Sequence, residues 1–438
     1  MFKKTKNFFI FIFLSILTVF SVNSASASSS PDETAFIFNT LLFLICGFLV
    51  MWMAAGFAML ESGMVRSKNV STICLKNVGL YSISGIMFYI VGYNLAYGIP
   101  EGGYMGSFSS FVAAEDMATG YAAHSDWFFQ MVFCATTVSI VSGTIAERIK
   151  IWPFFIFAAI LAGIIYPIEM GWQWGGGWLS SMGFSDFAGS TLVHAAGGAA
   201  ALAGAIIIGP RIGRFAADGT STPIPASSIP LATLGTFILW LGWFGFNGGS
   251  QLAIGSMDDA VAVSNIFVNT NIAACSGLIV AMIISQTIYG KVDVTFALNG
   301  ALAGLVSITA EPLMPTAYSS MLIGGIGGMI AVFGTQFISS LKIDDVVGAL
   351  PVHLIAGIWG TIAVAITNPD TSFVTQTIGA FSVVIFVFIL SAVVWSVLKM
   401  TIGVRPTEEE EQLGSDKSEV GIEAVSYTHL TLPTTPYV

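Results

Sequence analysis

The chain alternates between long apolar stretches and short polar connections over residues 34–400. Each stretch is about as long as the ~20 residues that a helix needs to cross the hydrocarbon core of a bilayer. Only helices and closed barrels satisfy every backbone hydrogen bond in lipid, so the pattern predicts an all-α polytopic membrane protein. Eleven such segments are expected, at residues 36–60, 77–98, 127–146, 151–171, 190–209, 229–248, 264–288, 294–310, 318–339, 347–367 and 376–399.

The composition also indicates a protein that is embedded in lipid. Hydrophobic residues make up 55% of the 438 residues, charged residues 9%, and the mean hydropathy is +0.83. A soluble globular protein, in which about 25% of the residues are charged, is therefore excluded. The net charge of −10 argues against the basic face of a nucleic-acid-binding protein. The four cysteines form no CxxC pair, so we expect neither disulfides nor a zinc site, and we interpret them as small core residues.

Both ends of the chain differ from its apolar body. Three lysines, an apolar stretch from Phe8 to Phe20 and small residues at 25–27 have the order of a secretory signal peptide. The alternative is an uncleaved first membrane helix, although the apolar stretch is shorter than a span. The expected organisation is a signal peptide over 1–27, a membrane domain over 28–403, an acidic cytoplasmic tail over 404–424, and a probable non-native tail over 425–438.

The basic residues predict the orientation in the membrane. After removal of the signal peptide twelve remain, and all of them fall in alternate connections. By the positive-inside rule these connections are cytoplasmic, which places the N-terminus outside the cell membrane and the C-terminus inside. An odd number of spans follows, in agreement with eleven. The residues are Arg66, Lys68, Lys76, Arg148, Lys150, Arg211, Arg214, Lys291, Lys342, Lys399, Arg405 and Lys417.

A short phrase occurs twice, at the start of the fifth and of the tenth segment. DFAGSTLVHAAGG and DVVGALPVHLIAG share the spacing D-x2-G-x3-V-H-x3-G. The two segments cross in opposite directions, so the phrase predicts an inverted-topology repeat of five plus five helices with a final eleventh helix. At 1.5 Å per residue, each histidine lies about 12 Å beyond its aspartate. His194 and His353 therefore approach the membrane midplane from opposite faces.

These two histidines are the only ones within apolar segments, because His124 falls in a loop and His429 in the C-terminal tail. A single buried histidine is most often bonded to a backbone carbonyl. A symmetry-related pair at matched depth favours a solute or proton path, since ionisable groups at this depth are energetically costly. Two histidines without further ligands make a poor metal site, so no metal is expected.

Aromatic residues gather at the predicted external ends of several segments. With the topology above, Phe133, Trp174, Phe246 and Ser250 all lie outward of the midplane. Most tryptophans at such positions belong to interfacial belts. If these side chains converge, a ring face and a hydroxyl would instead form a cation site worth about 2 kcal/mol or more when desolvated.

The residues resemble the Amt/Mep/Rh family of ammonium transporters, most closely its Amt branch. The resemblance covers about residues 34–423. It implies an eleven-helix homotrimer in the plasma membrane with one pore per subunit, which carries ammonium or ammonia. The motifs that carry it are GFAMLESGMVRSKN, GTIAERIK, YPI…WGGGWL, DFAGSTLVH, LGWFGFNGGS, FVNTNIAA, DDVVGALPVH and GVRPTEEEE.

The resemblance also assigns roles to residues. It implies that Trp174, Phe133 and Ser250 form the external ammonium site and that Phe133 and Phe246 form a stacked gate beneath it. His194 and His353 would be paired imidazoles that line the pore, and Asp186 would support the external site from behind as well as capping its helix. A cytoplasmic PII-type regulatory partner is implied too, but the altered sequence after Glu423 puts its binding in doubt.

The chemistry of ammonium suggests a mechanism. Moving the bare ion into low dielectric has an idealised cost of order 20 kcal/mol, whereas deprotonation near pH 7 costs roughly 4 kcal/mol for an amine with a pKa of about 10. We expect ammonium to be collected outside, deprotonated, and conducted as ammonia. The histidine pair offers a relay for the proton, and the sequence leaves both electrogenic uptake and a gas channel open. A membrane enzyme is not expected, because Glu61, Glu147 and Glu311 fall near segment ends. The main alternative is an ammonium sensor.

Overall fold

The structure, a computed structural model, describes residues 31–424. The predicted signal peptide over 1–27 and the predicted non-native tail over 425–438 lie outside the described residues. Within the described range the chain is helical, and its only β-structure is an isolated antiparallel bridge between Phe215 and Ser221.

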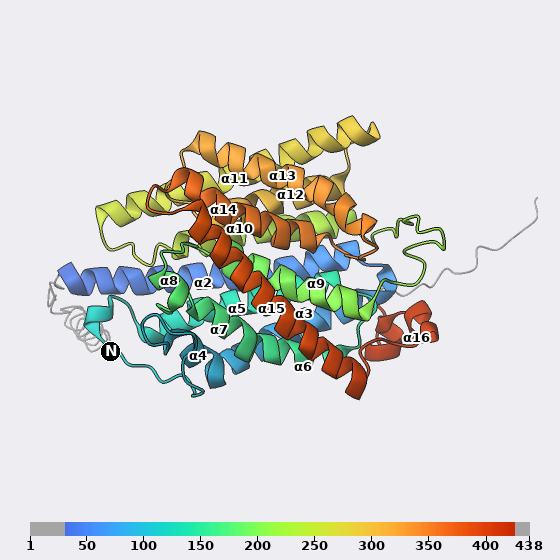
Figure 1. Cartoon of the computed structure of the whole chain (residues 1–438), viewed down its shortest axis with the longest axis horizontal. Coiled ribbons are helices and arrows are strands. Elements are labelled where there is room, and N and C mark those ends of the chain that lie inside the picture. The colour runs from blue at the N-terminus through green and yellow to red at the C-terminus, as the bar shows by residue number, and fades with distance from the viewer. Residues whose placement is uncertain (1–30, 425–438) are drawn as a thin grey trace, which may run out of the picture.

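The helices lie side by side along the long axis of the molecule, and α15 crosses the bundle obliquely (Figure 1). Ten helical spans in the described range are long and apolar enough to cross a membrane. The eighth predicted segment forms α12, which is apolar but only 16 residues long. The helices are α2 (Pro31–Met64), α3 (Val70–Met87), α4 (Tyr93–Tyr97), α5 (Ala123–Thr144), α6 (Ile151–Ile160), α7 (Tyr166–Gly171), α8 (Trp178–Ser181), α9 (Ala196–Ile208), α10 (Ile229–Gly249), α11 (Met257–Tyr289), α12 (Val294–Thr309), α13 (Ala317–Ser340), α14 (Ala356–Thr367), α15 (Phe373–Thr401) and α16 (Glu408–Leu413).

Several spans are interrupted by a turn of π-helix. Phe88–Gly92 joins α3 to α4, and Leu161–Ile165 joins α6 to α7. Ser190–Ala195 and Leu350–Ile355 precede α9 and α14, and they contain the two intramembrane histidines. π-turns inside helices are frequent at functional sites. Two of these four π-turns therefore coincide with the two copies of the repeated phrase.

Small residues allow the helices to pack closely, as is usual between helices in membranes. Where α2 meets α10, a Cβ on Gly63 would lie 2.4 Å from the backbone nitrogen of Ala232. A Cβ on Gly235 would lie 2.3 Å from the backbone nitrogen of Leu60. Replacement of either glycine would force these two backbones apart.

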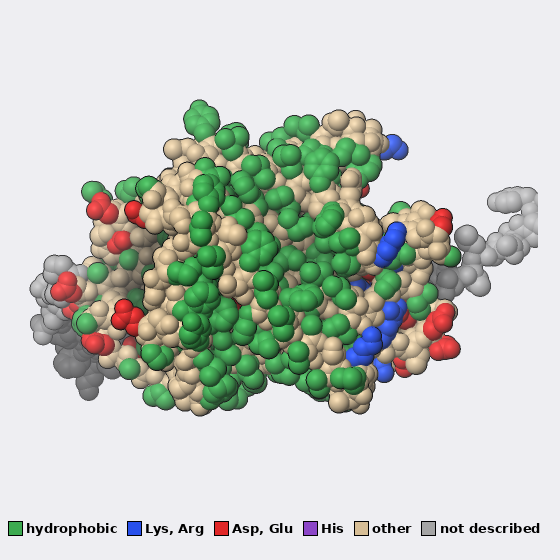
Figure 2. All heavy atoms as spheres, in the orientation of Figure 1, with side chains coloured by type: hydrophobic (Ala, Val, Ile, Leu, Met, Phe, Trp, Pro, Cys, Tyr) green, Lys and Arg blue, Asp and Glu red, His purple; other side chains and the backbone are tan. Residues whose placement is uncertain are grey.

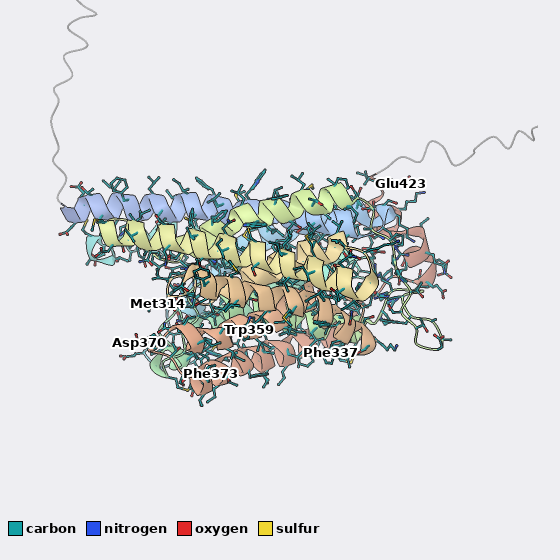
Figure 3. All side chains as sticks on the ribbon, turned by 90° about the horizontal axis from the view of Figure 1, so that it is seen from above. Met314, Phe337, Trp359, Asp370, Phe373 and Glu423 are labelled. Carbon is teal, nitrogen blue, oxygen red and sulfur yellow. The ribbon has the colours of Figure 1, made fainter. Side chains whose placement is uncertain are left out.

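The surface separates into an apolar middle and two charged ends. In Figure 2 hydrophobic side chains cover the middle of the visible face, Lys and Arg side chains gather together with acidic ones at the end where α16 lies, and acidic side chains also occur at the opposite end. Figure 3 shows which residues lie at each end of the molecule. Met314, Asp370 and Phe373 lie toward one end and Glu423 lies at the other, with Trp359 of α14 between them.

The basic end is held by buried ion pairs. The Asp344 carboxylate accepts hydrogen bonds from Nε and the backbone nitrogen of Arg211 at 2.8 and 2.9 Å, and Glu147 accepts one from Arg211 Nη1 at 2.8 Å. Burial by itself would raise the pKa of Asp344, but the hydrogen bond from Arg211 and the charges of Arg148 and Arg211 lower it to about 2. The connections after α5, α9 and α13 are thereby locked together.

The acidic tail is docked on this end. Asp416 accepts hydrogen bonds from the backbone nitrogens of Ser71 and Thr72 at 3.0 and 2.8 Å, at the start of α3. A carboxylate at this position satisfies N–H groups that the helix leaves unpaired. Glu411 receives hydrogen bonds from Arg405 at 2.8 and 3.1 Å and from the backbone nitrogen of Ile212 at 2.8 Å.

Candidate functional site

The two motif histidines meet in the middle of the bundle. The Nδ1 atoms of His194 and His353 are 3.2 Å apart, and their ring centroids are 5.2 Å apart with 21° between the planes. Both side chains are buried. Since one Nδ1 must donate and the other accept, the two rings carry opposite tautomers when both are neutral. The structure thus brings together the pair that the repeated phrase predicts to be close.

Each motif packs against the helix start of the other. A Cβ on Gly198 would lie 2.7 Å from Leu354, and a Cβ on Gly357 would lie 2.4 Å from the carbonyl oxygen of Ser190. The final glycine of each phrase therefore faces the π-turn of the other phrase. The two phrases therefore contact each other through equivalent positions.

The aspartates of the two motifs start these helices. The Asp186 carboxylate accepts hydrogen bonds from four consecutive backbone nitrogens, those of residues 189–192, at 2.8 to 2.9 Å. Burial raises the pKa of Asp186, although these hydrogen bonds act in the opposite direction. Asp345 accepts hydrogen bonds from Gly348 and Leu350 at 3.2 and 2.7 Å. Gly189 and Gly348 have φ angles of 108° and 77°, which explains the glycine at this position of the phrase.

A cavity of about 370 Å³ lies where the first turns of α5 meet the turn after α7 and the end of α10. Trp174, Phe133 and Ser250 all line it. Asp186 does not line it; its carbonyl oxygen accepts a hydrogen bond of 2.8 Å from Trp174 Nε1 and so orients the indole from behind. The remaining lining residues are Tyr97, Tyr121, Asp126, Phe129, Gln130, Gln173, Phe187 and Leu252.

Aromatic rings continue from the cavity to the histidines. Trp174 lies edge-to-face with Phe133 at 5.9 Å, and Phe133 stacks on Phe246 at 4.0 Å. Phe246 in turn stacks on His194 at 5.3 Å. The buried Phe246 therefore separates the cavity from the histidine pair, and the two phenylalanine rings close the route between them.

Ser250 is arranged to accept hydrogen bonds from a solute. Its hydroxyl lies 2.8 Å from the carbonyl oxygen of Phe246, to which it donates its proton. The oxygen lone pairs therefore remain for an N–H donor in the cavity. Together with the faces of two aromatic rings, this arrangement suits a small cation that carries N–H groups.

Beyond the histidines a small cavity of about 10 Å³ is lined by His353, Phe57 and Glu61, among others. This volume is close to the lower limit for one water molecule. Glu61 accepts a hydrogen bond of 2.8 Å from Ser142 Oγ, and its Oε1 has no hydrogen-bond partner among the described residues. The carboxyl group of Glu61 thus borders the same cavity as His353. The sequence did not predict this, because Glu61 falls near the end of an apolar segment.

Comparison with known proteins identifies the family. A sequence model described as Ammonium Transporter Family matches residues 41–425. The chain belongs to the ammonium transporter family. It is 41% identical over 408 residues to ammonium transporter Amt2 of Archaeoglobus fulgidus, covering 86% of each chain. It is 37% identical to a putative ammonium transporter of Synechocystis, covering 93% of this chain and 94% of that one.

Solved structures agree with this family. A structure titled "Sensor Amt Protein" superposes with a TM-score of 0.83 at 37% identity and covers 88% of this chain and 98% of its own. Mep2 of Candida albicans superposes with a TM-score of 0.78 at 25% identity and covers 94% and 95%. Membership of the ammonium transporter family makes the chain a membrane transport protein and not an enzyme.

Some residues of this ammonium transporter family member were missed by sequence reasoning. Trp243 stacks on His194 at 4.9 Å, and its Nε1 donates a hydrogen bond of 2.7 Å to Thr309. Phe57 lies 6.3 Å from His353. These contacts join helices that are distant in sequence, so nothing local predicts them. Trp243 does lie within LGWFGFNGGS, and its place one turn before Phe246 could have pointed to the pore.

The cysteines of this family member are free, and the prediction that all four are core residues is only partly right. Cys46 and Cys134 are buried, Cys275 is half-buried and Cys74 is exposed. Cys74 lies on the outer side of α3, where an apolar membrane environment accepts a small thiol as readily as the protein core does. Among the described residues no group of three or more His, Cys, Asp or Glu side chains is arranged to hold a metal ion.

Proposed function

We propose that this chain transports ammonium. The ion binds in the cavity beside Trp174, here named the outer cavity, and loses a proton there. Ammonia then passes the stacked rings of Phe133 and Phe246, the phenylalanine gate, and reaches the histidine pair. The observation that carries the proposal is the uninterrupted column of rings from Trp174 through Phe133 and Phe246 to His194. In this proposal Trp174, Phe133 and Ser250 bind ammonium, and Asp186 holds Trp174 in place.

The energetics favour deprotonation before the gate. An ammonium ion that enters the apolar region beyond Phe133 would face an idealised desolvation cost of order 20 kcal/mol. Ring contacts and one hydroxyl offset only a few kcal/mol of this cost. Loss of the proton costs roughly 4 kcal/mol near pH 7. Potassium has no proton to lose, so the same site would exclude it.

The histidine pair provides acceptors and donors for ammonia in an otherwise apolar route. His194 Nε2 is buried without a hydrogen-bond partner among the described residues and is therefore free to bind a solute. The bond between the two Nδ1 atoms could also relay a proton, because imidazole exchanges protons near neutral pH. Whether the proton accompanies ammonia decides between electrogenic uptake and a gas channel.

The topology that we propose has eleven membrane-spanning helices, with the short α12 as the eighth span. The N-terminus would be external and the C-terminus cytoplasmic, in the cell membrane. Support comes from the gathering of Lys and Arg side chains at the end where α16 lies (Figure 2). The reciprocal contact between the two phrases supports a repeat of five plus five inverted helices.

We also propose a homotrimer and a PII-type cytoplasmic partner, both on the basis of family membership. The exposed apolar side chains along α2, such as Phe48 and Trp52, are available to lipid or to a neighbouring subunit. The docked tail leaves the connection between α9 and α10 exposed at Ala217 and Asp218, where a cytoplasmic protein could bind.

A direct test is current recorded from purified protein in liposomes under an ammonium gradient. We expect an ammonium-dependent signal or flux and none with potassium. A protein that sensed ammonium without transport would give neither, and it would fail to restore growth of a transporter-deficient cell on limiting ammonium. The family description and the named relatives favour transport over this sensor alternative.

A further inference from the structure

Three polar side chains form a stripe on one side of α7 and the turn that follows it. They are Tyr166, Glu169 and Gln173, whose spacings of three and four residues place side chains on the same face of a helix. Gln173 lines the outer cavity, whereas Tyr166 and Glu169 are fully buried. The stripe therefore leads from the cavity into the interior of the protein, beside the phenylalanine gate.

Every member of this stripe carries polar atoms that have no hydrogen-bond partner within residues 31–424. These atoms are the Tyr166 hydroxyl, both carboxyl oxygens of Glu169, and the amide oxygen of Gln173. Buried polar atoms nearly always have a partner, and a buried carboxylate without one is strongly unfavourable. An ionisable group kept at such a cost within a membrane span usually has a function.

The surroundings of Glu169 differ from those of the nearby Asp186. The Asp186 oxygens are occupied by four backbone N–H groups. The titratable groups within electrostatic range of Tyr166 and Glu169 are Asp186, Cys134 and Tyr97. None of these is a cation. The charge of a Glu169 carboxylate is therefore best neutralised by a proton, and its lone pairs are free to accept one.

We propose that Glu169 is the group that accepts the proton which ammonium loses in the outer cavity, with Gln173 as the polar link from the cavity to Glu169 and Tyr166 as the next polar group beyond it. The proposal rests on the proposed function and names the acceptor for its deprotonation step. The ligand of the stripe is a proton carried by water, for which carboxyl, hydroxyl and amide oxygens are suitable partners.

The step balances in atoms and charge. One N–H bond of ammonium breaks, and its electron pair stays on nitrogen, which gives ammonia. The proton passes through water in the cavity beside Gln173 and forms an O–H bond with a carboxylate oxygen of Glu169. A cation and a carboxylate thus become two neutral groups, which lowers the cost of both in an apolar surrounding. Ammonia continues to Phe133, and Glu169 releases the proton before the next cycle.

The test is uptake of radiolabelled methylammonium by liposomes that contain the purified full chain, measured over a range of external pH. We expect Glu169→Gln to lower the maximal initial rate about tenfold or more and to flatten its pH dependence. The half-saturating concentration should not change, because Trp174, Phe133 and Ser250 are untouched. Glu169→Asp should recover part of the rate with a shifted pH profile.

A matched control is Glu311→Gln. Glu311 is also a buried carboxyl group on the side of the outer cavity, but it is hydrogen-bonded to Asn368 at 2.9 Å and does not line the cavity. We expect its replacement to leave rate and pH profile unchanged. If Glu169→Gln behaves in the same way as this control, the proposed acceptor is wrong.

Two further measurements distinguish a failure of the Glu169 proposal from a folding defect and from a failure of the proposed function. If Glu169→Gln does not fold, Tyr166→Phe removes only a hydroxyl without a partner, and an unchanged pH profile in that variant would overturn the stripe. Wild-type liposomes that take up no more methylammonium than empty ones would instead refute the proposed function itself. Loss of rate with an unaltered pH profile in Glu169→Gln would indicate a structural role and would also count against the proposal.

Discussion

Asp186 and Asp345 each start a helix that carries a histidine, but Asp186 accepts four backbone N–H groups and Asp345 accepts two. Beyond the first motif lies a cavity of about 370 Å³ with aromatic walls, and beside the second lies one of about 10 Å³. The same short phrase therefore supplies the same helix start and the same histidine in both halves. The two halves differ because of the helices around each phrase: the first phrase borders the aromatic cavity, and the second is closed off by ion pairs and the tail.

The largest expected effect comes from removal of the histidine pair, to which each half of the chain contributes one residue. Replacement of both His194 and His353 by leucine should abolish ammonium-dependent current in liposomes, because the apolar route then has no proton carrier at its centre. Current from the double variant equal to that of the wild type would refute the relay. The single variants, measured in the same way, show whether the two halves contribute equally.

The helix starts should differ in their contribution to stability. In Asp186→Asn the amide nitrogen cannot accept, so two hydrogen bonds are lost, at about 1.5 kcal/mol each for a charged acceptor. In Asp345→Asn only one is lost. Thermal unfolding in detergent should therefore show a loss of about 3 kcal/mol for the first variant and about half of that for the second. Equal losses would show that the hydrogen-bond difference does not matter.

The outer cavity should show its role at low substrate concentration. Trp174→Leu removes the ring face that we propose to bind the cation. Such a face is worth about 2 kcal/mol when desolvated, which corresponds to roughly thirtyfold weaker binding. Uptake should fall most when external ammonium is scarce and recover at high concentration. A loss that is the same at all concentrations would argue against recruitment. Trp152→Leu is a suitable control, because Trp152 is 73% exposed and does not line the cavity.

The smallest expected effect lies at the docked tail. Asp416→Ala removes the acceptor of the first N–H groups of α3, which should cost about 1 kcal/mol. Limited proteolysis should then cleave the tail faster, while uptake by the same preparation measures whether docking matters for transport. Asp370→Ala, in the exposed loop before α15, serves as a control for loss of one carboxylate.

The sequence predicts much of the fold because each feature it uses is local or periodic. The predicted segments fall on helical residues, ten helical spans among the described residues are long and apolar enough to cross a membrane, and the repeated phrase carries the two histidines that meet, His194 and His353. The π-turns were not predictable, since they leave the apolar pattern of a span unbroken. Likewise, the short α12 has the composition of a membrane span and falls below its usual length only when its ends are known.

Only those residues of the candidate site that belong to a family motif could be predicted from the sequence. The family resemblance indicates Trp174, Phe133 and Ser250, and the structure places all three around one cavity. Glu169 belongs to no quoted motif position, and a single acidic residue in an apolar segment does not reveal whether its oxygens find partners. The same is true of Glu61, whose distance from His353 depends on the packing of α2 against distant helices.

The hydrogen bond between the two Nδ1 atoms holds one shared proton, and it can point in either of two directions. A proton that crosses the pair reverses this direction, so the next proton from the same side meets a pair with the opposite polarity. Both rings must then exchange their outer protons before the path is restored. Turnover through this route would therefore have a compulsory reset step, and its rate would limit transport even when ammonium is abundant.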